Sequence, residues 1–140
     1  MKGQNFTSSS LPIVVINTNG NTIEDDPKVA VDIGIIDNGP GNLNYLTDPF
    51  NAYNGHCGIE FRGNSTQGFD KKTYSIELWT SAGLDTSASI LGLPKEEDWI
   101  LHANHLDKTF LRNTLSYHIW RKIGYWSSNT IYVELVLDGD

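Results

Sequence analysis

The chain has 140 residues, of which 39% are hydrophobic and 11% aromatic, a composition typical of one globular domain rather than of a disordered chain. Its formal net charge of -7 argues against nonspecific binding to nucleic acid or to an anionic membrane, which needs a basic surface. The single cysteine, Cys57, excludes an internal disulfide, and no apolar run approaches the roughly 20 residues of a membrane span. We therefore expect any cationic site to be local.

The first third of the chain predicts a polar terminus followed by strands. Residues 1–10 are polar and rich in serine, which is typical of a disordered linker or terminus, and the fold is expected to begin near Leu11. The apolar run 12–16 predicts a buried strand, and the alternation of apolar residues across 28–36 predicts a second one. Residues 37–55 are rich in Asn, Gly and Pro, so we expect a long loop that is anchored by its aromatic residues.

The segment from residue 59 to residue 78 is the most informative part of the sequence. Apolar residues alternate in 59–61 and again in 74–78, which predicts two half-buried strands, and Gly, Asn and Ser between them favour a turn. The polar loop between the strands carries the cations Arg62, Lys71 and Lys72. Cations at the rim of a strand pair suit an anionic ligand, so recognition of phosphate or carboxylate is the first hypothesis.

Strand parity distinguishes the two lysines of this loop. Lys72 has the same parity as Tyr74 and Ile76, so its side chain is predicted to point toward the interior side. Lys71 has the opposite parity and is predicted to face water. The alternative for Lys72 is a surface lysine whose stem lies along apolar groups while its ammonium stays in water.

A helix and further strands are predicted in the last third of the chain. A short strand is expected around residues 99–101, and a helix is expected over residues 108–123, with Asp107 as N-cap and Gly124 as the C-terminal stop. Apolar residues recur along this helix at four-residue steps, and we expect them to face the core: Leu111, Leu115, Ile119 and Ile123.

The alternation over residues 130–137 predicts a last strand, and Asp138-Gly139 is a strong hairpin signal. Because no returning strand follows, we expect the sequence to be truncated in a hairpin. The fold class predicted from these elements is α+β, with a twisted antiparallel sheet and one main packed helix.

Several motifs occur in one order along the chain: residues 11–18, 59–78, 91–94, 98–101 and 107–113. Together they resemble the CotH family, the spore-coat protein H kinases and their secreted bacterial relatives. The resemblance covers most of residues 11–140 and implies that they form the incomplete N-terminal part of a CotH-like domain, similar to the N-terminal lobe of a kinase. It also implies a secreted or cell-surface bacterial protein.

The resemblance implies a site for ATP with Mg²⁺ and an unknown protein substrate that accepts phosphate on Ser or Thr. In that reading Lys71 or Lys72 contacts ATP phosphate, Arg62 and Ser65 lie near the same loop, and Asp107 or Arg112 supports them. The sequence departs from familiar kinases, since it has no glycine-rich nucleotide loop and no Glu in the predicted helix. The catalytic acids and most metal ligands are expected beyond Asp140, so we expect no kinase activity from these residues alone.

Two other classes of function are consistent with parts of the sequence. A carbohydrate-binding or adhesion module is suggested by the acidic composition, the many Asn and Asp residues, and the aromatic residues Tyr45, Trp79, Tyr125 and Trp126. Hydrolysis by paired carboxylates is suggested by Glu60 and Glu77 on adjacent predicted strands. A Ser-His-Asp arrangement is disfavoured, because no G-x-S-x-G motif occurs and Ser65 is typical of a turn.

Overall fold

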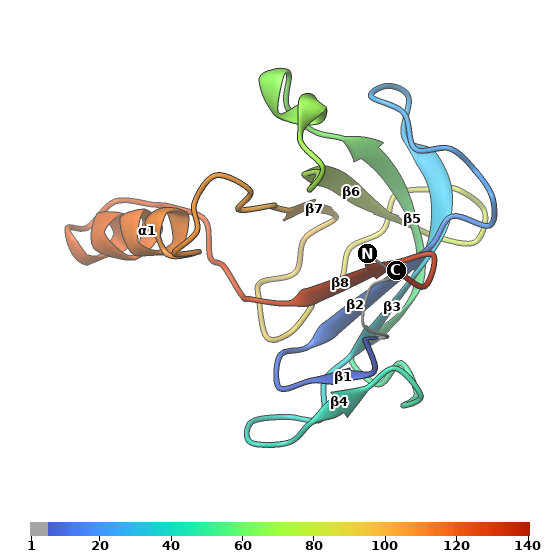
Figure 1. The fold of residues 1–140 in the computed structure, drawn as a ribbon, viewed down its shortest axis with the longest axis horizontal. Helices are drawn as coiled ribbons and strands as arrows, with labels where there is room; N and C mark the ends of the chain where they lie inside the picture. The colour runs from blue at the N-terminus through green and yellow to red at the C-terminus, as the bar shows by residue number, and fades with distance from the viewer. Residues whose placement is uncertain (1–5) are drawn as a thin grey trace.

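The structure is a computed structural model that describes residues 6–140, apart from the side chains of residues 65 and 66, and it contains two sheets and an α-helix (Figure 1). The large sheet consists of β2 (Ile13–Asn17), β3 (Val29–Ile36), β5 (Tyr53–Phe61), β6 (Tyr74–Trp79), β7 (Asp98–Leu101) and β8 (Glu134–Leu137). The remaining elements are β1 (Ser8–Ser9), β4 (Asn44–Tyr45), the 3-10 helix η1 (Ser65–Gly68) and α1 (Arg112–Lys122).

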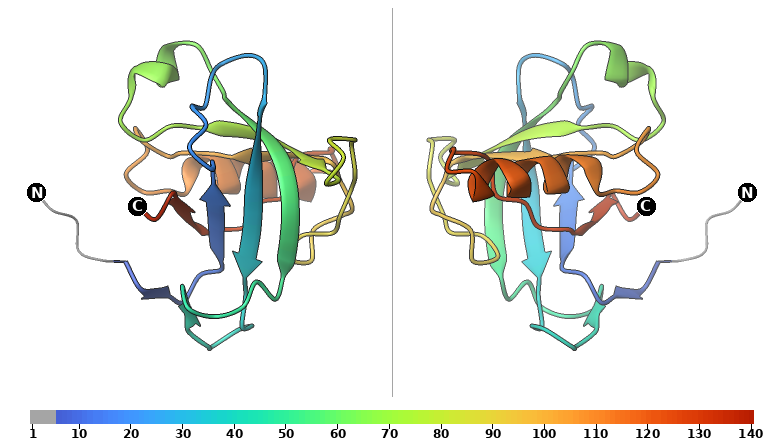
Figure 2. Two further views of the ribbon diagram at one scale, coloured as in Figure 1. Left: turned by 90° about the vertical axis from the view of Figure 1, so that its right-hand side faces the viewer. Right: turned by 90° about the vertical axis from the view of Figure 1, so that its left-hand side faces the viewer.

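The α+β class is confirmed, with a curled sheet and one α-helix among the described residues. The strand order is β7-β6-β5-β3-β2-β8. All neighbours from β7 to β2 are antiparallel, as predicted, whereas β8 pairs in parallel with β2 and makes the sheet mixed. The β5–β6 pair therefore lies well inside the sheet, and the loop that joins these strands leaves from its rim (Figure 2).

The core lies on the concave face of the curled sheet. Alternate residues of β2, β3, β5 and β6 are buried there, and the largest include Ile16, Ile35, Ile59, Ile76 and Leu78. Ile90, from the connection between β6 and β7, covers part of this face. The period-two alternation that predicted half-buried strands is thus confirmed residue by residue in β6, where buried and half-buried positions alternate.

The helix begins later than the sequence pattern predicts. Asp107 is not its N-cap, because α1 starts at Arg112 and the preceding Leu111 makes no side-chain capping bond. The carbonyl oxygen of Asp107 instead accepts from the Phe110 amide (3.0 Å) in a separate turn over residues 107–110, and its carboxylate accepts from the amides of Thr109 and Arg112. Phe110 then adopts a left-handed backbone conformation, with φ of 59°, which interrupts helical geometry just before α1.

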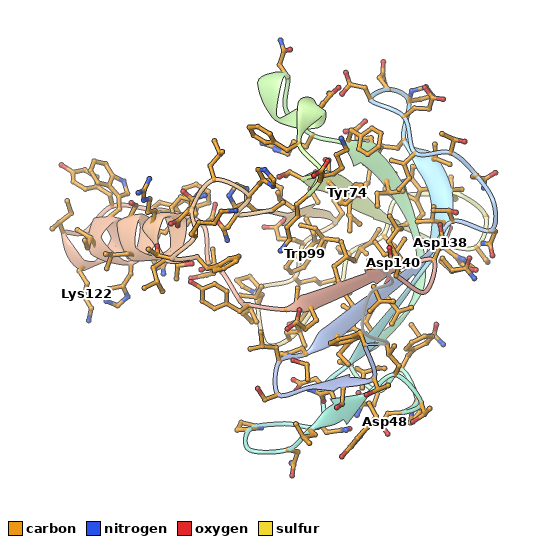
Figure 3. All side chains as sticks on the ribbon, viewed as in Figure 1. Asp48, Tyr74, Trp99, Lys122, Asp138 and Asp140 are labelled. Atoms are coloured by element: carbon orange, nitrogen blue, oxygen red, sulfur yellow. The ribbon has the colours of Figure 1, made fainter. Side chains whose placement is uncertain are left out.

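The apolar stripe of the helix is exposed, which contradicts its predicted place in the core. No residue of α1 is buried, and Leu115 and Ile119 are 55% and 51% exposed. The helix projects away from the sheet and ends at Lys122, and side chains stand out on all the sides of it that Figure 3 shows. Periodicity identifies the face on which a helix would pack, but burial also requires an opposing surface, and the described elements place none against this face.

Of the terminus predicted to be disordered, residues 1–5 lie outside the described residues and part of the remainder is paired. Ser8–Ser9, within the segment predicted as a disordered terminus, pairs with β4 in the loop 37–55. The buried Asn44 side chain anchors this loop by donating to the carbonyl oxygen of Leu11 (2.8 Å). The ring of Phe50 anchors it further by packing directly over Gly34, where a Cβ atom would lie 2.5 Å from the ring. Aromatic anchoring of this loop was predicted; the strand pair was not.

The predicted hairpin turn after β8 is present. Asp138 and Gly139 both have positive φ, of 51° and 87°, as type I′ turns require, and Leu137 and Asp140 exchange two backbone hydrogen bonds of 3.0 Å. The backbone amide and hydroxyl of Thr18 both donate to the Asp138 carboxylate at 2.8 Å. These bonds attach the turn to the end of β2.

A matched pair of substitutions separates the buried sheet face from the exposed helix face. Ile76→Ala should lower the free energy of unfolding by about 2–5 kcal/mol, because Ile76 is 1% exposed and its loss leaves a cavity. Ile119→Ala should change it by less than about 0.5 kcal/mol, because that side chain is half exposed and alanine favours helix. Urea denaturation measures both values. Equal losses would show that the helix face is buried.

Candidate functional site

The candidate site is built on the β5–β6 loop, residues 62–73. The loop begins and ends where Phe61 pairs with Tyr74, and these two rings lie 5.7 Å apart between centroids. The backbone amide of Arg62 donates to the carbonyl oxygen of Thr73 (2.9 Å), which extends the pairing by one step. The sheet thus fixes both ends of the loop, and η1 forms its middle.

Lys72 is half-buried beneath this loop. Its ammonium donates to the carbonyl oxygen of Gln67 at 2.5 Å and lies 6.0 Å from the centroid of the Phe61 ring. The Gln67 side chain is in turn bound to the Asp25 carboxylate (2.6 Å) and to the carbonyl of Gly63 (2.5 Å). The ammonium of Lys72 is therefore directed into the loop rather than into open solvent.

The other cations of the loop lie closer to its surface. Lys71 is exposed, and its ammonium lies 5.5 Å from the centroid of the Phe110 ring. Arg62 is exposed at the border of the cavity described below. The backbone of Ser65 begins η1, whereas its side chain lies outside the described part of the structure.

Asp107 organises the turn before α1. Its carboxylate accepts hydrogen bonds from the Thr109 hydroxyl (2.6 Å), from the Thr109 amide (3.1 Å) and from the Arg112 amide (2.9 Å). The Arg112 guanidinium also lies 3.6 Å from it. The bond from the Thr109 hydroxyl, followed by the Arg112 amide, lowers the pKa of Asp107 below its ordinary value. Asp107 is thus an ionised acceptor for its own turn.

The β5–β6 loop and the Asp107 turn are neighbours in space. The rings of Phe69 and His105 stack with centroids 4.6 Å apart and planes 15° apart, and the Ala103 amide donates to the Thr73 hydroxyl at 3.1 Å. The cation–π contact of Lys71 with Phe110 is a further link between the loop and the Asp107 turn. Among the described contacts, none joins Lys72 to Asp107 or Arg112. Sequence patterns did not mark Phe69, His105 or Phe110 for a role, because no periodicity marks a contact between loops.

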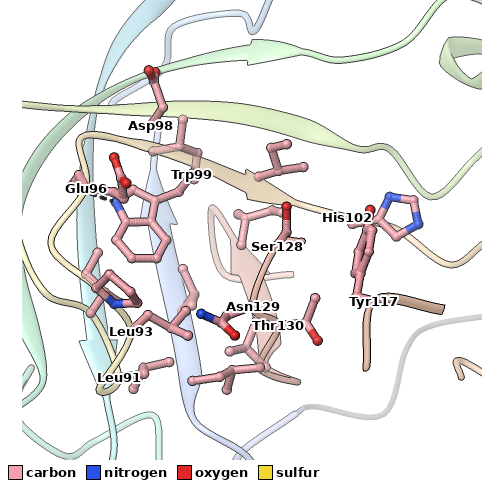
Figure 4. A pocket seen from close by; sticks show the side chains of 18 of the residues that line it. Leu91, Leu93, Glu96, Asp98, Trp99, His102, Tyr117, Ser128, Asn129 and Thr130 are labelled. Carbon is pink, nitrogen blue, oxygen red and sulfur yellow. Dashed lines mark hydrogen bonds between the residues drawn. The ribbon is translucent and has the colours of Figure 1, made fainter. Parts of the chain in front are cut away.

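A cavity of about 680 Å³ lies beside the loop, between the concave face of the sheet and α1 (Figure 4). Its apolar wall comes from the sheet core, and Trp99 closes one side, with its indole nitrogen donating to the carbonyl of Glu96 (3.2 Å). Its polar border includes Arg62, His102 and Asn113, of which the last two are 2.7 Å apart. Neither Lys71 nor Lys72 lines this cavity.

The two carboxylates considered for hydrolysis share a lysine. The ammonium of Lys28 lies 3.6 Å from Glu60 and 3.5 Å from Glu77, on the convex side of the sheet. Burial lowers the pKa of Lys28, but the charges of Glu60 and Glu77 outweigh it, so that its pKa is raised. The carboxylates are thus partners of one cation, an arrangement that serves sheet pairing rather than acid–base catalysis across a cleft.

Cys57 and the aromatic residues complete the set of candidates. The thiol of Cys57 is buried in the core, and this burial raises its pKa to about 12, so it is an unreactive thiol. Trp79 is half-buried and packs over Gly58. Trp126 is 87% exposed, and the neighbouring Tyr125 stacks on Trp120 at 4.6 Å between centroids.

The curled sheet with one helix and a cationic loop on the β5–β6 rim has an α+β fold, and the comparisons with known proteins identify its family. The family model described as CotH kinase protein matches residues 59–140, more than half of the 140-residue chain. The chain therefore belongs to the CotH kinase family. No curated protein and no solved structure matches it.

Two further findings concern metal ions and membrane spans. Among the described residues, no group of three or more His, Cys, Asp and Glu side chains is placed to hold a metal ion. Within the same residues, no helix has the length and apolar character needed to cross a membrane.

The Asp107 turn should respond to acid. Because the folded pKa of Asp107 is lowered, its contribution to stability is present above the unfolded value of 3.8 and is lost as the pH falls through the folded value. NMR spectra of the Thr109 and Arg112 amides, recorded from about pH 6 to pH 2, should show a shared midpoint below 3.8. Asp107→Asn should abolish that titration. A midpoint at or above 3.8 would show that these hydrogen bonds do not hold the carboxylate.

Proposed function

We propose that this chain forms part of the ATP-phosphate site of an atypical protein kinase that phosphorylates Ser or Thr. The observation that carries the proposal is the position of Lys72, a half-buried ammonium held inside the β5–β6 loop of a chain from the CotH kinase family. Lys71 and Arg62 add positive charge to the same loop, although the chain as a whole is acidic.

The surroundings of Lys72 suit a phosphate ligand. Its present partner is a neutral carbonyl oxygen, and an ionised phosphate oxygen forms a stronger, charge-assisted hydrogen bond with an ammonium. The ammonium is already held by the Gln67 carbonyl oxygen and lies 6.0 Å from the centroid of the Phe61 ring, so little side-chain freedom is left to lose when a ligand binds. Phosphoryl transfer depends chiefly on positioning and charge neutralisation, which are the contributions that such a lysine makes.

The described residues contain no preformed cluster of metal ligands. Kinases hold Mg²⁺ with acidic and amide side chains, and the described residues offer no cluster of acids that could hold an ion. We therefore assign no step of the reaction to Mg²⁺ here. In the proposal the metal ligands and the acid that orients the acceptor hydroxyl come from other parts of the protein, and the described chain binds ATP without transferring phosphate.

Titration with a nonhydrolysable ATP analogue tests the site. Lys72→Met should weaken binding roughly ten- to a hundredfold, because it removes a charge-assisted hydrogen bond from a half-buried position. Lys95→Met removes the same charge from an exposed lysine of the connection between β6 and β7, and should leave the affinity unchanged. Lys72→Arg should lose less than Lys72→Met. Isothermal titration calorimetry measures all four proteins, and equal affinities for wild type and Lys72→Met would refute the assignment.

A second candidate function is carbohydrate binding, which the exposed aromatic group at the end of α1 favours. Trp126 is 87% exposed and the preceding Tyr125 stacks on Trp120, and exposed rings of this kind offer apolar faces on which sugar rings stack. In this case soluble glucans should quench tryptophan fluorescence, Trp126→Ala should abolish most of the change, and the ATP analogue should leave the fluorescence unchanged. Quenching that survives Trp126→Ala would exclude this platform.

A further inference from the structure

Three contacts of different chemistry join the β5–β6 loop to the segment 102–110. One aromatic stack, Phe69 on His105, and one cation–π contact, Lys71 over Phe110, join side chains that are distant in the sequence. A hydrogen bond from the Ala103 amide to the Thr73 hydroxyl (3.1 Å) also joins the two segments. The two segments are thus held by independent interactions of different chemistry.

Phe110 has an unusual backbone. A bulky residue seldom adopts positive φ, and Phe110 has φ of 59°. Its amide donates to the carbonyl of Asp107 (3.0 Å), and its own carbonyl accepts from the hydroxyl of Tyr132 (2.6 Å). Such conformations persist only where the surrounding structure fixes them, and they concentrate at functional sites.

Burial does not explain why a phenylalanine occupies this strained position. Phe110 remains 45% exposed and is not part of the hydrophobic core. Asparagine or glycine would adopt the same backbone at lower cost. What phenylalanine adds is a ring face directed at the ammonium of Lys71.

We propose that Phe69 and Phe110 are positioning residues that lock the β5–β6 loop to the Asp107 turn, so that the two segments move as one unit. The consequence for ligand binding rests on the proposed function: the lock holds the loop in the conformation in which Lys72 is directed inward. The adjacent lysines then have different roles, since Lys72 meets phosphate and Lys71 holds the loop in place by its contact with Phe110.

Amide hydrogen exchange tests the lock without any ligand. Phe69→Leu keeps an apolar side chain but removes the stack, and Phe110→Asn keeps the left-handed preference but removes the ring. Each should speed exchange in both segments, 62–73 and 102–111, by roughly two- to tenfold, the effect of losing one aromatic or cation–π contact. Phe69→Tyr should keep the wild-type exchange rate, because tyrosine stacks equally well.

Tyr45→Leu is the matched control, because it removes an exposed aromatic residue from β4, at the opposite end of the molecule from the β5–β6 loop (Figure 1). It should leave exchange in both segments unchanged. If Phe69→Leu speeds exchange only in residues 62–73, or if Phe69→Tyr behaves like Phe69→Leu, the segments are not coupled and the proposal fails. Thermal unfolding of each variant shows whether a faster rate reflects global instability, which would speed exchange in β3 and β5 as well.

Affinity for the ATP analogue separates this proposal from the function on which it rests. If Lys72→Met weakens binding, Phe69→Leu and Phe110→Asn should also weaken it, by a smaller factor, and Phe69→Tyr should rescue it. Wild-type affinity in both lock variants would overturn their role as positioning residues. If the wild-type chain binds no nucleotide, the proposed function fails, and the exchange measurement still decides whether the lock exists.

Discussion

The pairing of Phe61 with Tyr74 at the end of the β5–β6 ladder is the constraint on which the site depends. It closes the 62–73 loop at the rim of the sheet. It also determines which alternate residues face inward, so that Tyr74 lies in the core and the side chain of Lys72 turns inward. A shift of this register by one residue would exchange the environments of Lys71 and Lys72. The burial of Ile59 and Ile76 on the same face opposes such a shift. Packing in the hydrophobic core therefore also determines which of the two lysines turns inward.

Local charge placement explains how an acidic chain offers a cationic loop. On the convex side of the sheet, Lys28 is shared between Glu60 and Glu77. In the loop, by contrast, the ammonium groups of Lys71 and Lys72 meet a carbonyl oxygen and aromatic rings, which are neutral. Neutral partners leave the positive charge available to a ligand. The aromatic contacts also limit the motion of the loop, which favours binding of a phosphate without a large loss of conformational freedom.

The sequence patterns were sufficient to predict the antiparallel strands of the large sheet and the turn at Asp138, but not the parallel pairing of β8 with β2 or the β1–β4 pair. They failed where a local hydrogen bond competed with the pattern. Asp107 satisfies amides of its own turn, and Phe110 leaves the helical region, so α1 begins at Arg112. The stripe through Leu115 was correctly placed on one face, but periodicity contains no information on whether another surface covers that face. Contacts between loops, such as Phe69 with His105, have no period at all and required the structure.

In the proposed phosphate site, the ammonium of Lys72 exchanges its bond to the Gln67 carbonyl for a bond to a phosphate oxygen. Lysines labelled with ¹³C at the ε position, observed by NMR during titration with the ATP analogue, test it most directly. The Lys72 resonance should move most and saturate with the affinity measured by calorimetry, while that of Lys95 stays fixed. A saturating shift at other lysines with Lys72 unmoved would contradict the account.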